Sequence, residues 1–356
     1  MFNPKRLSLA RARRGLTSKA LAEKAGIRAD TITRLEKGRH NPEPETIDKM
    51  AKALGYPSDF FTGEEIEEID LGAVSFRSFS KMTARERDAS VFAGSLGLLL
   101  NNWVEERFGL PEPDILDMSH EANPEAAASY LRQHWGIGQQ PIGNILGLLE
   151  TKGIRLFSLS ENTASVNAFS FWRGGKPFIF LNNFKTAESS RFDAAHELGH
   201  LVMHKHGDPK GVRSLEREAD RFASAFLMPS DDVRAKIHGT VTIDIILRAK
   251  FRWRVSAMSL AYRLHSLGIL SDWQYKSICI ELSRRGYRSG EPMGIERETS
   301  TAWKKVLTLL WKEKITKNDI AKDLSLPLDE IEGLIWSLTA NTIDSVKKDR
   351  TELRAV

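Results

Sequence analysis

Two histidines and a glutamate near the middle of the chain have the spacing of a metal-binding motif. Residues 196–200 read His-Glu-Leu-Gly-His within an apolar stretch that is typical of a helix. Because an α-helix turns about once every 3.6 residues, His196 and His200 would lie on one face and could share a metal ion. The carboxylate of Glu197 would be offset from that ion and could take a proton from a water bound to it. This spacing predicts a zinc site with Glu197 as general base.

A second amphipathic helix is expected downstream, over residues 215–229, and it offers a third ligand. Glu216 and Asp220 stand four residues apart in it, so they would share one face. Glu216 would complete a set of two histidines and one glutamate with an open position, as catalytic zinc requires. Asp220, one turn further on, could accept a hydrogen bond from the free ring nitrogen of a ligating histidine.

Other interpretations of this region stay open. Glu218 is the rival third ligand, and His204 and His206 are possible additional ligands, although surface or core histidines are commoner. The charged run at residues 216–221 is also compatible with a solvated, salt-bridged helix face. A site of this kind can bind metal for sensing rather than for cleavage.

The metal-binding helix needs a scaffold, and the residues before it predict a small sheet. Residues 153–158, 165–172 and 177–181 are short runs rich in aromatic and β-branched side chains. The sequence Arg-Gly-Gly-Lys at 173–176 separates the last two and is typical of a hairpin turn. The remaining sequence is mainly helical in its periodicity. We therefore predict a mostly α, α+β fold.

The first 62 residues have the layout of a helix-turn-helix. Thr17 can cap a helix over residues 18–24, and Gly26 supplies the tight turn that follows it. A third helix is expected over residues 28–37, ended by Gly38. In this layout the third helix lies in the major groove with its N-terminal residues at the base edges.

The charge of the chain is segregated in a way that supports DNA binding by this segment. Residues 1–62 hold 13 basic and 7 acidic residues, a net charge of +6, whereas residues 63–150 hold 6 and 15, a net charge of −9. The predicted base contacts are Arg28, Ala29, Asp30 and Thr33. The predicted phosphate contacts are Arg34, Lys37, Arg39, Arg14 and Lys19. The alternative is a generic helical module with a solvated basic face.

The N-terminal segment resembles the XRE family of phage-repressor-like helix-turn-helix domains. The resemblance rests on residues 14–17, 25–27 and 36–38, which read Arg-Gly-Leu-Thr, Ala-Gly-Ile and Glu-Lys-Gly, and it covers about the first 60 residues. It implies double-stranded operator DNA as a partner and, by analogy, a homodimer on two half-sites. Ser18 stands where the family often has a glutamine that reads an adenine, so no base preference is carried over.

The central region resembles the ImmA/IrrE family of zinc metallopeptidases. The resemblance covers roughly residues 125–235 and rests on residues 177–183, 196–200 and 216–229, which occur in that order. It implies a gluzincin-like metallopeptidase domain with a small sheet. It also implies the following roles: zinc ligands His196, His200 and Glu216, and general base Glu197.

Members of that peptidase family cleave a cognate XRE-type repressor and so relieve repression. The resemblance therefore implies a zinc endopeptidase that acts on a repressor-type protein, in trans or on its own chain. The alternative is a non-proteolytic transcriptional regulator whose metal domain senses a signal or a partner.

The expected organisation of the 356 residues has five parts. These are a helix-turn-helix domain at 1–62, an acidic linker and helical segment at 63–120, a zinc peptidase domain at 121–235, a helical subdomain at 236–290, and a helical C-terminal module at 291–356. Within the last two parts, residues 256–271 and 315–336 each have a helix-turn-helix appearance. They are packing modules or, alternatively, DNA-contacting or dimerising elements.

The composition predicts a cytoplasmic protein. No apolar run approaches the roughly 18 residues of a membrane span, and no apolar segment follows the first residues, so neither a span nor a signal peptide is expected. Cys279 is the only cysteine, so no intrachain disulfide can form and a reducing compartment is expected.

Overall fold

The computed structural model describes residues 1–69, 83–159, 168–182, 185–205, 211–288, 290–335 and 338–339. The prediction of a mostly helical α+β fold with a small sheet is confirmed. Of the sequence predictions above, residues 165–167, Asn183, His206 and Trp336 lie outside the described part of the chain. Among the described residues, no helix has both the length and the apolar character needed to span a membrane.

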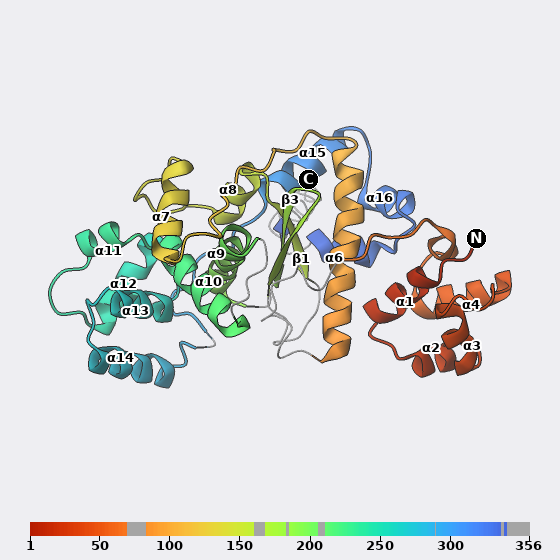
Figure 1. Cartoon of the computed structure of the whole chain (residues 1–356), viewed down its shortest axis with the longest axis horizontal. Coiled ribbons are helices and arrows are strands. Elements are labelled where there is room, and N and C mark those ends of the chain that lie inside the picture. Colours follow the sequence, from red (N-terminus) through yellow and green to blue (C-terminus); the bar gives the residue numbers. More distant parts are fainter. Residues whose placement is uncertain are drawn as a thin grey trace, which may run out of the picture.

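The N-terminal residues 1–62, called the head below, form a compact helical unit (Figure 1). Its helices are α1 (Pro4–Arg13), α2 (Ser18–Ala25), α3 (Ala29–Glu36), α4 (Pro44–Leu54) and the 3-10 helix η1 (Ser58–Thr62). The Thr17 side chain accepts a hydrogen bond from the Ala20 amide and so begins α2. Gly26 ends α2 with φ 68°, a left-handed conformation that costs glycine little. The resulting turn directs α3 across α2.

A long helix, α6 (Ala84–Glu105), separates the head from the sheet (Figure 1). It begins with a capping box in which Thr83 and Glu86 satisfy each other's backbone amides. Its inner surface carries Gly97, where an added Cβ would lie 2.5 Å from Cζ of Phe180 in the sheet. The absence of a side chain at this point lets the helix approach the sheet closely.

Within the described residues the sheet has three strands, β1 (Arg155–Leu159), β2 (Phe169–Arg173) and β3 (Lys176–Asn182), in the order β1-β3-β2. β1 runs parallel to β3, and β2 pairs antiparallel with β3 through the glycine turn that the sequence predicts. One face is a stack of buried aromatic rings in which Phe180 lies 5.2 Å from Phe157 and 4.8 Å from Phe169 between ring centroids. This face packs against α6.

The opposite face of the sheet packs against the helix that carries the histidines, α9 (Ala187–Met203). From that face Ser170 and Trp172 of β2 donate hydrogen bonds to α9. α10 (Val212–Leu227) lies antiparallel beside α9, and α7 (Pro124–His134) and α8 (Ile145–Thr151) complete the layer.

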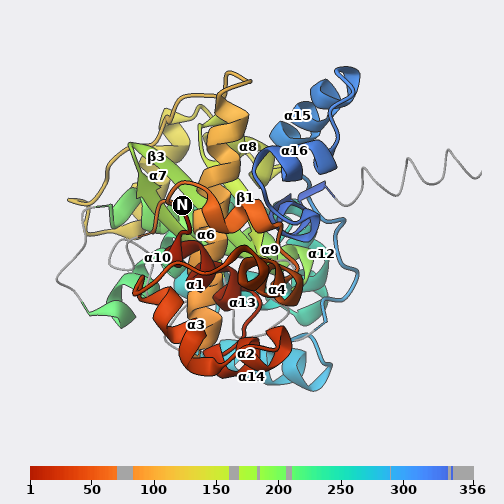
Figure 2. The same ribbon diagram turned by 90° about the vertical axis from the view of Figure 1, so that its right-hand side faces the viewer.

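The remaining described helices form two groups, one at the left end of the molecule and the other next to α6 (Figure 1). The first group is α11 (Ser230–Lys236), α12 (Ile243–Trp253), α13 (Ala257–Ser266) and α14 (Asp272–Arg284). The second group is α15 (Thr301–Lys312), α16 (Lys317–Asp323) and a helical segment at 328–335. In Figure 2, which faces the head, α15 and α16 lie beside α6 and close to the head.

Candidate metal centre

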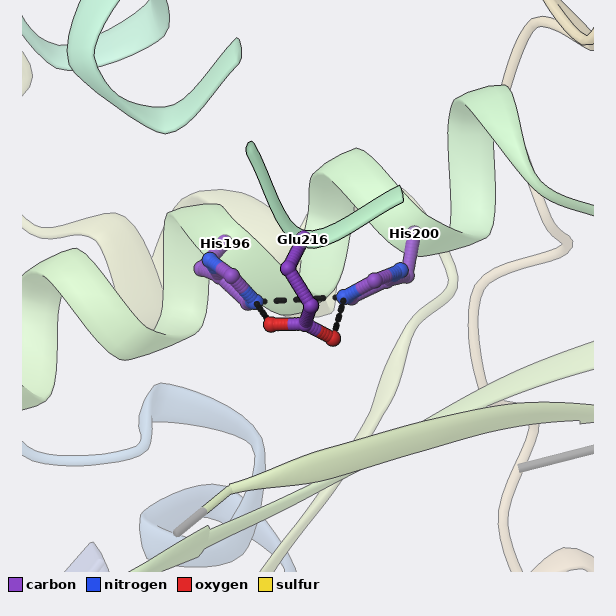
Figure 3. Close-up of side chains that lie close together, drawn as sticks. All are labelled: His196, His200 and Glu216. Atoms are coloured by element: carbon purple, nitrogen blue, oxygen red, sulfur yellow. Dashed lines mark hydrogen bonds and ion pairs between the residues drawn. The ribbon is translucent and has the colours of Figure 1, made fainter. Parts of the chain in front are cut away.

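His196, His200 and Glu216 converge on one point between α9 and α10 (Figure 3). The Nε2 atoms of the two histidines are 3.1 Å apart. Each lies 3.3 Å from one carboxylate oxygen of Glu216. The three side chains meet because the histidines stand one turn apart on the same face of α9. The neighbouring helix α10 brings Glu216 across that face.

The donor atoms have the chemistry and spacing of a zinc site. Four-coordinate zinc with bonds of about 2.0–2.1 Å holds neighbouring donors about 3.3 Å apart. The measured separations of 3.1 and 3.3 Å are close to that value. Two imidazoles and one carboxylate also leave a fourth position for water or substrate. The residues present therefore fit a catalytic metal ion.

The electrostatics of the cluster favour a cation. Burial opposes a charged imidazole at His196, but hydrogen bonds with Asp220 and Glu216 outweigh burial and raise the pKa of His196 to about 10. Burial also opposes ionisation of Glu216, yet hydrogen bonds with the two histidines hold the pKa of Glu216 well below its ordinary value. The carboxylate of Glu216 therefore stays ionised at neutral pH.

Both histidines are held from behind by a second partner. Nδ1 of His196 lies 2.9 Å from Oδ1 of Asp220. Nδ1 of His200 lies 3.0 Å from Nδ1 of His204, whose Nε2 is 3.3 Å from Oε2 of Glu218. A histidine that binds metal through Nε2 carries its proton on Nδ1, so these contacts orient both rings. The structure thus places Glu218 behind His204, away from the three converging donors.

Glu197 points away from solvent and toward the sheet. Its residue is 2% exposed, and its Oε2 accepts a hydrogen bond of 2.6 Å from Oγ of Ser170 on β2. The sequence predictions did not include Ser170. A polar residue that alternates with Phe169 and Phe171 in an aromatic strand was the available signal, because alternate strand residues face opposite sides.

The head presents most of its predicted DNA contacts to solvent. Arg28, Ala29, Asp30 and Thr33 are exposed on the N-terminal part of α3 or just before it. Of the predicted phosphate contacts, those that are also exposed are Arg34, Lys37, Arg39 and Lys19. This face of the head is therefore open to a DNA duplex.

Arg14, the fifth predicted phosphate contact, is engaged within the protein. Its Nε donates to the carbonyl of Leu54 at 2.8 Å, and its Nη2 lies 3.2 Å from Oδ1 of Asp329. Its guanidinium also lies over the Tyr56 ring, 4.9 Å from the centroid. Arg14 thus joins the head to the C-terminal helices.

Two separate ranges of the chain match known protein families. Residues 7–61 match the helix-turn-helix family model, and a helix-turn-helix domain implies DNA binding. Residues 149–265 match the family model described as the IrrE N-terminal-like domain, which represents a metallopeptidase-like family. The matched range includes the sheet, α9 and α10.

A curated relative supports the match of the head. It is an uncharacterized HTH-type transcriptional regulator from Archaeoglobus fulgidus, 43% identical over 44 residues. The alignment covers 12% of this chain and 63% of that protein. The likeness is therefore confined to part of each protein. The chain carries a helix-turn-helix domain joined to an IrrE N-terminal-like domain.

Proposed function

We propose that this chain is a cytoplasmic DNA-binding transcriptional regulator whose central domain is a zinc-dependent endopeptidase. In this proposal the peptidase cleaves a repressor-type protein, in trans or on the same chain, and so relieves repression. The observation that carries the proposal is the convergence of His196, His200 and Glu216, with Glu197 adjacent, in a chain that also has a helix-turn-helix head.

His196, His200 and Glu216 would hold the zinc ion through the three donors that converge between α9 and α10. When bound, zinc would polarise the scissile carbonyl and lower the pKa of water at the site. Asp220 and His204 hold the histidine rings in the orientation that directs Nε2 to that point. The rigid support reduces the reorganisation that binding would otherwise require.

Glu197 would move the protons of the reaction. Its carboxylate would accept the proton of the attacking water and return it to the leaving amine. The hydrogen bond from Ser170 limits rotation of the Glu197 carboxylate. The same strand, β2, is the outer one of the described strands and lies beside α9, so an extended substrate could add to it by β-strand pairing.

The head would direct this activity to an operator. Its exposed α3 would lie in the major groove, with Arg28, Asp30 and Thr33 at the base edges and exposed lysines and arginines on phosphates. A homodimer on two half-sites is part of the proposal, by analogy with repressors that bind two-fold operators.

A non-proteolytic regulator is the second candidate, and one observation favours it. Glu197 is 2% exposed and its carboxylate already accepts a hydrogen bond from Ser170. A base that is buried and engaged in this way is poorly placed to reach water without rearrangement. In this alternative the metal domain binds zinc and senses a signal or a partner.

The proposal is tested by metal analysis followed by a cleavage assay. Purified full-length protein should contain about one zinc per chain, as expected for one site of this donor set. Glu216→Ala should lose the zinc, whereas Arg217→Ala, which truncates an exposed side chain of the same helix, should retain it. Incubation with XRE-type repressors from the same organism should yield defined fragments. Full zinc occupancy in Glu216→Ala would refute the assigned ligand set.

A further inference from the structure

The C-terminal helices repeat the helix-turn-helix of the head at the same spacing. Thr316 stands 299 residues after Thr17, and it begins α16 as Thr17 begins α2, by accepting a hydrogen bond from the amide three residues on. At this constant offset the buried residues Leu21, Ala22, Ile32 and Leu35 correspond to Ile320, Ala321, Ile331 and Leu334, which are also buried.

The turn between the two helices is repeated as well. Gly26 has φ 68°, and Ser325, its counterpart, has φ 52°. In both turns the backbone therefore reverses through a residue in the left-handed conformation. Each is followed by an apolar residue, Ile27 in the head and the buried Leu326 in the C-terminal copy. Residues 316–335 are therefore a second helix-turn-helix, and the helical segment 328–335 corresponds to the DNA-facing helix α3.

The segment 328–335 is covered on two sides. Toward the head, Nη2 of Arg13 lies 2.8 Å from Oε2 of Glu330, and the Tyr56 hydroxyl donates to Oε1 of Glu330 at 2.6 Å. Toward the sheet, Oγ of Ser158 donates to the Gly333 carbonyl at 2.6 Å. A helix held between the head and the sheet cannot enter a DNA groove while these contacts last.

The charge of the segment 328–335 explains why it binds the head. Its sequence, Leu-Asp-Glu-Ile-Glu-Gly-Leu-Ile, contains three carboxylates and no lysine or arginine. Its Asp329 and Glu330 face Arg14 and Arg13, whereas a DNA phosphate would be repelled. Glu330 is 2% exposed and paired on both oxygens, so this contact is specific rather than a loose surface attraction.

We propose that the second helix-turn-helix is a docking surface for the head, and that Asp329 and Glu330 compete with DNA phosphates for Arg14. Arg14 lies at the C-terminal end of α1, directly before the turn into α2, whose N-terminus faces the DNA backbone in this fold. Pairing with Asp329 withdraws that charge from the DNA-binding face. The docked head binds DNA more weakly than the released head, and DNA binding loosens the docking.

The test uses the full-length protein and a fluorescein-labelled DNA duplex of mixed sequence at low salt. Asp329→Asn and the double variant Asp329→Asn/Glu330→Gln should bind the duplex about three- to tenfold more tightly than wild type, as expected for one recovered phosphate contact. The matched control is Glu332→Gln. It removes the same charge from the same helix but pairs with Lys317, at 3.5 Å, rather than with the head.

Two results would overturn the proposal. One is an unchanged or weaker affinity in Asp329→Asn, whose side chain is 61% exposed and whose substitution should not affect folding. The other is an equal gain in Glu332→Gln, which would mean a general charge effect.

Hydrogen exchange gives an independent readout that needs neither zinc nor cleavage. Exchange at backbone amides of residues 328–335 should rise when the duplex is added to wild type, and it should be raised without DNA in the double variant. No change on DNA addition would contradict competition between docking and DNA. Failure of the proteolytic function would leave both measurements unaffected.

Discussion

Each histidine of the candidate metal centre has a hydrogen-bonding partner on the side away from the three converging donors. His196 is backed by Asp220, and His200 is backed by the pair His204 and Glu218. Such partners fix which ring nitrogen carries the proton and where the other points. Each histidine is therefore supported by its own set of contacts.

Removing the support of His200 should weaken metal binding without removing a ligand. We expect His204→Ala to lower zinc affinity about 10- to 100-fold, because His200 loses the group that orients its ring. A competition titration with a zinc-binding dye measures this change. The control is His265→Ala, which removes a histidine that pairs with Asp272 outside the site. An unchanged zinc affinity in His204→Ala would mean that the contact has no positioning role.

Sequence spacing predicts the three converging side chains and Asp220, but it does not predict Ser170. A spacing of four positions from His196 to His200 suffices to place both on one helix face, whatever the remaining fold is. Glu216 and Asp220 follow the same rule on the next helix. Ser170 lies on a strand and contacts Glu197 only because β2 packs on α9. The spacing of residues along the chain therefore does not predict that contact.

At the scale of the elements, α6 and the sheet depend on a close approach at one glycine. Gly97 faces Phe180, which is fully buried in the stack of aromatic rings. We expect Gly97→Ala to lower the free energy of unfolding by about 1–3 kcal/mol, because the new methyl group displaces the ring. The exposed Gly109, with open space around its Cα, offers the control Gly109→Ala. Chemical denaturation measures the free energy of unfolding of both variants. If Gly97→Ala were as stable as Gly109→Ala, the packing argument would be contradicted.

The contacts of Asp232 in α11 with α12 should make a pH-dependent contribution to the free energy of unfolding. Oδ1 of Asp232 lies 2.7 Å from Nη2 of Arg252, and Oδ2 accepts a hydrogen bond from Trp253. The hydrogen bond with Arg252 holds the pKa of Asp232 below its ordinary value of about 3.9. A carboxylate with a lowered pKa in the folded state stabilises the fold above the unfolded pKa, and this stabilisation is lost as the pH falls through the folded pKa.

We therefore expect Asp232→Asn to cost about 1–3 kcal/mol of unfolding free energy at pH 7 and progressively less below about pH 4. Denaturation of the two proteins across this pH range measures the difference. A difference that stays constant down to pH 2 would exclude a contribution from ionised Asp232.

The elements themselves were predictable to different degrees. Aromatic and β-branched runs predict the strands, and the turn at residues 173–176 predicts the pairing of β2 with β3. β1 pairs with β3 and not with β2, the next strand along the chain. No turn motif between neighbouring strands therefore predicts this parallel pairing. The pattern at residues 315–336 suggests a helix-turn-helix, but only the three-dimensional contacts show that its second helix is covered by the head.

At the scale of the whole molecule, a DNA-binding face and a metal centre lie on opposite sides of α6 (Figure 1). The head contacts the rest of the protein where α1 packs against α6 and where Arg13 pairs with Glu330 of the segment 328–335. A movement of α6 or of the segment 328–335 would therefore affect both the DNA-binding face and the metal centre. Under the proposed function, this arrangement gives a physical route by which a substrate of the metal domain and the operator would influence each other.

DNA binding by the whole chain should depend steeply on salt. We expect the logarithm of the binding constant to fall linearly with the logarithm of the salt concentration, because exposed lysines and arginines release counterions from the duplex. Lys37→Ala should reduce the slope by about one and weaken binding similarly for all sequences. Fluorescence anisotropy over a salt series measures both. Binding that does not respond to salt would contradict the proposed phosphate contacts.

The measurement that tests the central claim most directly compares wild type with Glu197→Gln. Both proteins are loaded with zinc, their metal content is measured, and each is incubated with XRE-type repressors and examined by mass spectrometry. We predict equal zinc content, defined repressor fragments with wild type, and no fragments with Glu197→Gln. Fragments from both proteins would contradict the role of Glu197, and zinc-loaded wild type that leaves every repressor intact, its own head included, would contradict the peptidase itself.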